Sequence, residues 1–124
     1  MKKLIQLLGL LMSVFGIPRW LFAPPVEFIF DPKNGLSGRV VTPNNDGAND
    51  LVYFRFNNPL DSRVELFVYD VTGALIYSAA GLSGQNALTW DGKGPGGAAV
   101  ASGVYIYQIV AEGKTFNGTI VVAR

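Results

Sequence analysis

The chain of 124 residues contains no cysteine and no histidine. Without cysteine it has no disulfides, thiolate metal sites or thiol nucleophiles, so packing alone must stabilise the fold. Without histidine, neither a Ser-His-Asp arrangement nor a histidine-based zinc site can be assembled. Carboxylate pairs such as Asp46 with Asp50 remain, but short acidic turns lack the apolar surroundings that raise a catalytic pKa. We therefore expect a protein that is not an enzyme.

Charge is also scarce, since charged residues make up only 15% of the chain. Loss of Lys2, Lys3 and Arg19 with the first 23 residues would leave seven basic and nine acidic side chains, a net charge of −2. The seven remaining basic residues are scattered singly along the sequence. Phosphate binding needs clustered lysine and arginine, so we expect no nucleic-acid partner.

A long apolar run occurs only at the N-terminus. Lys2 and Lys3 precede an apolar stretch from Leu4 to Ile17, which is the pattern of a secretory signal peptide. Pro18 interrupts this run before the length of about 20 residues that a membrane span needs. We predict a hydrophobic signal helix over 1–23, with a retained membrane anchor as the alternative. Membrane contact would then come only through this segment, if it stays uncleaved.

Glycine and proline separate short apolar runs in the rest of the chain. There are 15 glycines and seven prolines, and hydrophobic residues make up 49% of the sequence. Glycine and proline break helix interiors, so the pattern favours many short strands with tight turns. Seven or eight strands at this spacing predict an all-β sandwich. The expected strands are 26–30, 51–56, 64–70, 74–78, 87–90, 103–112 and 114–123.

Alternation along these runs identifies the candidate core. Val52, Phe54 and Phe56 share one face of their strand, as Val64, Leu66 and Val68 do in the next. Trp90 lies on the same face as Leu88, which favours a core position over an exposed ligand-stacking platform. We place a first strand and turn at 24–38 and the sandwich domain at 39–124.

Several motifs resemble one group of bacterial modules. They are Trp90 to Gly92, Ser102 to Tyr107, Tyr69 to Gly73, the terminal Val121 to Arg124, and Thr42 to Asp50, which reads Thr-Pro-Asn-Asn-Asp-Gly-Ala-Asn-Asp. Together they resemble the immunoglobulin-like C-terminal modules of secreted proteins. These include the Ig-like domain of the flagellar hook-capping protein, type IX secretion sorting domains and gliding-motility-associated C-terminal domains. The resemblance covers about residues 39–124.

The resemblance implies an immunoglobulin or fibronectin-III-like sandwich of about seven strands. It also implies export to the periplasm, the cell surface or the medium, and protein partners in the envelope or the secretion machinery. Such modules usually follow a large cargo, whereas here the module follows the apolar segment almost directly. We therefore expect a structural or assembly module that acts through protein contacts. The final strand, 114–124, would be its pairing edge. The alternative is a sorting domain read by transport machinery.

The segment from Thr42 to Asp50 is the candidate metal site. Calcium takes several oxygen ligands, and a tight turn could bring Asn44, Asp46, Asn49 and Asp50 around one cation. Asparagine and aspartate also form Asx turns and tolerate left-handed backbone without a metal, and this interpretation carries more weight. A third functional class follows, a calcium-dependent ligand- or carbohydrate-binding module, to which five tyrosines could contribute an aromatic face.

Overall fold

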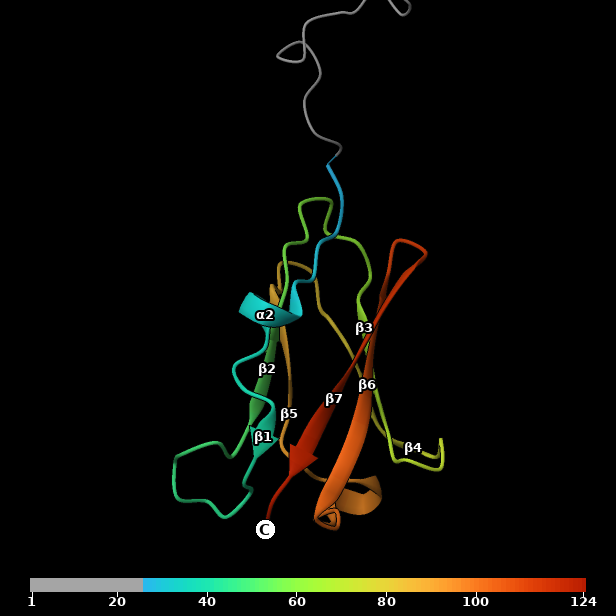
Figure 1. Ribbon diagram of the computed structural model, residues 1–124. Helices are drawn as coiled ribbons and strands as arrows, with labels where there is room; N and C mark the ends of the chain where they lie inside the picture. Colours follow the sequence, from blue (N-terminus) through green and yellow to red (C-terminus); the bar gives the residue numbers. More distant parts are fainter. Residues whose placement is uncertain (1–25) are drawn as a thin grey trace, which may run out of the picture.

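A computed structural model describes residues 26–124, which form two facing β-sheets with almost no helix (Figure 1). The larger sheet has five strands in the order β1-β7-β6-β3-β4, and the smaller pairs β2 with β5. The all-β sandwich predicted from the sequence is confirmed. The predicted signal peptide, 1–23, lies outside the described residues. Within these residues, no helix is long and apolar enough for a membrane span.

Seven strands make up the two sheets, and their bounds are as follows. In the larger sheet they are β1 (Val40–Val41), β3 (Glu65–Tyr69), β4 (Leu75–Ala80), β6 (Gly103–Ala111) and β7 (Lys114–Val122). In the smaller sheet they are β2 (Val52–Arg55) and β5 (Ala87–Trp90). All strand pairs are antiparallel except β1 and β7, which run parallel. The short β1 was not predicted, because two residues carry no recognisable alternation.

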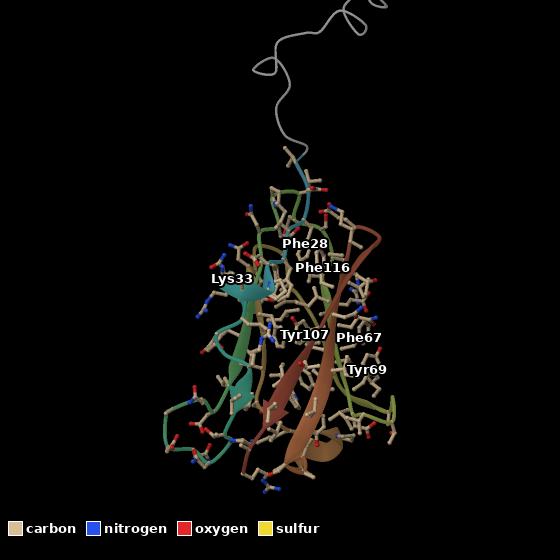
Figure 2. The ribbon with its side chains drawn as sticks, viewed as in Figure 1. Phe28, Lys33, Phe67, Tyr69, Tyr107 and Phe116 are labelled. Atoms are coloured by element: carbon tan, nitrogen blue, oxygen red, sulfur yellow. The ribbon has the colours of Figure 1, made fainter. Side chains whose placement is uncertain are left out.

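The predicted alternation builds the core between the sheets. Val52 and Phe54 on β2 face Leu66 and Val68 on β3, and all four are buried. Figure 2 shows Phe28, Tyr107 and Phe116 in the space between the sheets. Burial of large apolar side chains contributes about 1.5–3 kcal/mol each, so this layer is the main source of stability. The fully buried set also includes Trp90, Ile109, Ile120, Val41, Val64 and Val122.

The segment predicted as a first strand, 26–30, does not form one. It makes a single antiparallel bridge, in which Ile29 exchanges backbone hydrogen bonds with Asn57. Its partner strand ends there, because Asn57 is followed by Asn58 and Pro59, which turn the chain away. Phe28 and Phe30 are nevertheless buried, so this lead-in segment contributes to the same core as the rest of the domain.

The turn predicted within 24–38 contains one short helical turn, α2 (Pro32–Gly35). Asp31 caps it, since its side chain accepts a hydrogen bond from the Lys33 N–H. Proline at the first helical position fits the same local pattern. Gly35 is required there, because a Cβ would lie 2.5 Å from the Arg55 carbonyl oxygen. The turn thus sets α2 tightly against β2.

The final strand is only partly a free edge, which corrects the prediction of an open edge over 114–124. β1 covers its last residues, pairing Val40 with Val121 and Val41 with Val122. The Val121 N–H donates to the Arg39 carbonyl and the Ala123 N–H to the Val41 carbonyl. The open stretch of β7 is therefore limited to its first half.

Candidate functional site

The loop from Thr42 to Asp50 is organised around one carboxylate. The Asp50 side chain accepts hydrogen bonds from the backbone N–H groups of Asn44, Asn45 and Gly47, at 3.2, 2.9 and 2.8 Å. Two smaller Asx turns support it, because Asn44 accepts from the Asp46 N–H and Asp46 accepts from the Ala48 N–H. The acidic motif therefore folds back on its own backbone.

Backbone conformation explains the other residues of this loop. Asn45, Gly47 and Asn49 all have positive φ, at 58°, 82° and 56°. Glycine and asparagine adopt this region more easily than other residues. The Asx-turn interpretation of the sequence thus accounts for the local geometry.

The four candidate calcium ligands share this loop, but several of their oxygens already have partners. Both carboxylate oxygens of Asp50 and one of Asp46 accept N–H groups, and so does the Asn44 side-chain oxygen. The Asn49 carbonyl accepts the Thr42 N–H. Across residues 26–124, no three acidic side chains gather closely enough to hold a metal ion. Calcium binding here stays a prediction.

Trp90 is a core residue, as its alternation with Leu88 predicted. Its side chain is 1% exposed and its ring centroid lies 5.5 Å from that of Tyr105. The indole N–H donates to the Lys93 carbonyl at 2.9 Å, which fixes the start of the glycine-rich loop that follows β5. A buried ring with a satisfied N–H is unavailable as a stacking platform.

The five tyrosines do not form one exposed aromatic face. Tyr105 and Tyr107 are buried, whereas Tyr53 is exposed on the small sheet. Tyr69 is half-buried on β3, on the side away from the core, where its ring lies 6.4 Å from that of Phe67 (Figure 2). Tyr77 is half-buried on β4. The tyrosines are therefore divided between different surfaces and the core.

Glu112 forms a polar cluster that the sequence analysis missed. It lies in the two-residue turn between β6 and β7 with a φ of 53°. Its carboxylate accepts hydrogen bonds from the Phe28 N–H at 3.0 Å and the Ser62 hydroxyl at 2.8 Å. These bonds, the Phe28 bond first, hold the pKa of Glu112 below its usual value. Lys114, two residues further along, forms an ion pair with Glu27. The turn between β6 and β7 thereby holds Glu27 and Phe28 against the domain.

Two of the basic residues that stand singly in the sequence line one groove. Lys33 and Arg39 line a groove of about 590 Å³ together with Asp31, Pro32, Leu36 and Gly38. Arg55 lies beside the other side of α2 and stacks over the Tyr53 ring. The ion pairs within residues 26–124 involve other cations, namely Arg63, Lys93 and Lys114. The fold of residues 31–39 thus brings Lys33 and Arg39 to one groove.

The fold is that of an immunoglobulin-like β-sandwich module, and a comparison with known families identifies its family. The sequence model of the CHU_C type IX secretion signal domain matches residues 36–122. The chain therefore belongs to this family. This finding supports the expected resemblance. It favours the alternative, a sorting domain, over the structural or assembly module that was the first expectation. It also supports the coarser expectation of an exported or cell-surface protein related to type IX secretion. No curated protein matches the chain in sequence.

Two solved structures from Porphyromonas gingivalis share the fold. PorZ, described as an essential bacterial surface component of the type IX secretion system, is 22% identical with a TM-score of 0.54 over 72% of this chain. Dimeric latent PorU is 21% identical with a TM-score of 0.54 over 82% of this chain. The matched regions are 11% and 10% of those proteins. The chain thus spans about a tenth of each, and the likeness concerns the domain fold alone.

Proposed function

We propose that this domain is a non-catalytic sorting signal that directs the protein carrying it to the type IX secretion machinery. The observation that carries the proposal is the family match, which extends over residues 36–122 and so includes every strand of the sandwich. In such a role the folded surface is the functional element, because the transport machinery must recognise the domain by contact. The absence of histidine and cysteine from the chain is compatible with this non-catalytic role.

Expression in two isogenic bacterial strains tests the proposal. The full chain is produced in a strain with a working type IX system and in one that lacks its translocation component. We expect surface or medium recovery in the first strain and retention in the periplasm in the second. The intact mass from each fraction reports whether residues 1–23 are removed and whether the chain still ends at Arg124. Equal distribution in both strains would refute the proposal.

Two variants, one neutral and one destabilised, test whether the machinery recognises the folded domain. Arg63→Gln changes an exposed side chain outside the core, so it should be exported like the native chain. Trp90→Ala removes a central core ring, so it should fail in the competent strain if the machinery reads the folded domain. Export of an unfolded Trp90→Ala chain would mean that a linear segment is read instead.

One observation favours the second candidate, a structural module that stays at the envelope. Apolar side chains share the outer face of the large sheet, where Val40 and Val104 both pair with Val121. These three are 48%, 45% and 39% exposed, and Ile106 is 37% exposed. Exposed apolar patches often mark protein contacts. Envelope recovery in both strains, with a mass ending at Arg124, would favour this second function.

A further inference from the structure

The first half of β7 presents an open backbone edge in the part of the chain that the structure describes. The Val121 N–H bonds to β1, so odd-numbered residues of β7 direct their backbone groups away from β6. Thr115, Asn117 and Thr119 have the same parity, and β1 pairs only with Val121 and Val122. Their N–H and C=O groups therefore face outward without a strand opposite. Such an edge can pair with another chain.

A buried tyrosine reaches this edge from inside. Tyr107 on β6 pairs with Gly118 on β7, and a Cβ at Gly118 would lie 2.3 Å from the tyrosine oxygen. Three atoms at the end of the ring, the hydroxyl oxygen, Cζ and Cε1, lie within 2.5 Å of that Cβ position. The Tyr107 hydroxyl thus lies over Gly118, on the strand whose outer edge is open.

The Tyr107 hydroxyl has no hydrogen-bond partner among residues 26–124, although the residue is only 1% exposed. Every fully enclosed side-chain nitrogen or oxygen in this region has a partner, so this oxygen keeps a narrow opening to solvent. A buried hydroxyl usually finds a partner, because leaving it unpaired costs free energy. Because this hydroxyl has no protein partner among residues 26–124 and opens to solvent beside an open strand edge, it is available to hydrogen-bond a ligand bound there.

Arg39 supplies positive charge at the same place. Burial raises the pKa of the Tyr107 hydroxyl, and the nearby charge of Arg39 partly offsets that effect. Arg39 is also the residue at which β1 joins β7, through its carbonyl and the Val121 N–H. It lines the groove with Lys33 and Asp31, and the Asp31 carboxylate is occupied by the Lys33 N–H and the Asn34 amide. Among residues 26–124, neither Lys33 nor Arg39 forms an ion pair, so both side chains can meet an anion in this groove.

We propose that this edge binds an extended acidic segment of a partner protein. The segment adds as a strand beside Thr115–Thr119 and places a carboxylate between the Arg39 guanidinium and the Tyr107 hydroxyl. Main-chain hydrogen bonds to the edge give affinity, and the charged contact gives specificity. A peptide fits better than an anionic glycan, because only a peptide backbone matches alternating N–H and C=O groups. The inference rests on the proposed function in taking this partner to belong to the secretion machinery.

Peptide binding to the full chain tests the site directly. The probe is a fluorescent, end-blocked heptapeptide, Thr-Val-Glu-Val-Glu-Val-Thr, whose dissociation constant is measured by anisotropy. One comparison peptide has glutamine in place of both glutamates, and another is N-methylated at alternate backbone nitrogens. We expect the glutamate probe to bind about tenfold more tightly than the glutamine probe, because a charge-assisted hydrogen bond is lost. The N-methylated probe should not bind, because it cannot pair with the edge.

Three variants separate the backbone contribution from the charge. Arg39→Gln should abolish the preference for glutamate while leaving the glutamine probe bound. Asn117→Pro should abolish binding of both probes, because it removes an outward N–H that β6 does not use. Arg63→Gln is the control, since Arg63 is exposed and already paired with Glu65, and it should bind both probes as the native chain does. A circular dichroism melting curve checks that each variant is folded.

Several results would overturn the inference. Equal affinity of the native chain for the glutamate and glutamine probes would remove the acidic specificity. Undiminished binding of the N-methylated probe would exclude strand addition. If dextran sulfate then displaced this bound probe, the site would be a general anion site. If the chain is exported but binds no probe, this inference fails and the proposed function stands. If the probe binds but export does not need the secretion system, the proposed function fails alone.

Discussion

Gly118→Ala tests the most constrained contact in the sheet. A Cβ at Gly118 would lie 2.3 Å from the Tyr107 oxygen and 2.4 Å from Cζ, about 1 Å short of the 3.4 Å at which ordinary contact begins. Phe30 and Phe54 limit the movement of the ring, because they pack edge-on against it at centroid distances of 6.0 and 5.1 Å. A large aromatic side chain covering a glycine on the neighbouring strand is a known way to stabilise sheets.

The expected cost follows from this geometry. Overpacking a core costs about 1–3 kcal/mol, and the rigid support of Tyr107 favours the upper part, about 2–3 kcal/mol. For a domain of about 100 residues each kcal/mol lowers Tm by about 4–8 °C, so we expect a fall of roughly 8–24 °C. Urea unfolding followed by far-UV circular dichroism measures the free energy directly.

Two further variants make the test of Gly118→Ala decisive. Gly38→Ala is the control, because no atom lies within 4 Å of the added Cβ and it should change stability by less than about 1 kcal/mol. Tyr107→Leu shortens the side chain, so combined with Gly118→Ala it should be more stable than the sum of the single effects by about 1 kcal/mol or more. A Gly118→Ala cost below about 0.5 kcal/mol, or strict additivity, would refute the clash.

Three further predictions concern other parts of the domain. Trp90→Ala should lower the free energy of unfolding by about 3–5 kcal/mol in urea titrations, since it empties a fully buried site, and a loss under about 1 kcal/mol would place the ring at the surface. Glu112→Gln should lower the urea midpoint at pH 7. The pKa of Glu112 is below its ordinary 4.5 in the folded state, so its contribution is complete above that pH and is lost as the pH falls through the lower folded value. The two midpoints should therefore converge in acid, and a constant difference down to pH 2 would contradict this. Asp50→Ala should lower Tm more than Asp46→Ala, because it removes three hydrogen bonds instead of one. A calcium site predicts that calcium raises the native Tm and that Asp50→Ala abolishes the rise, whereas Asx turns alone predict no change of Tm with calcium or chelator.

The strand pattern was readable because alternation is a local property. Val52 and Phe54 face inward because successive side chains in a strand point to opposite sides, whatever the strand pairs with. The turn before β4 and the loop motif ending at Asp50 were readable for a similar reason. Their hydrogen bonds join residues within six positions of each other, so aspartate and glycine spacing reveals them.

The lead-in segment shows where local patterns fail. Val26 to Phe30 has the composition of a strand, but a strand needs a partner of equal length, and Pro59 ends the available one. The hydrogen bonds of Glu112 could not be predicted from local patterns either, because its partners Phe28 and Ser62 are 84 and 50 positions away. The calcium prediction stays untested, since the same oxygens serve the turn.

The sequence by itself determined the all-β class, most of the strands and the buried faces, and through its motifs the secretion-domain family. These depend on side-chain periodicity and on turns within a few residues. Only the tertiary structure decided that β1 covers the end of β7 and leaves Thr115–Thr119 open. It also brought the charge of Arg39 near enough to lower the pKa of Tyr107, and placed Lys33 in the same groove as Arg39. These features depend on which strands become neighbours, a choice made by packing of the whole chain that no short stretch of residues encodes.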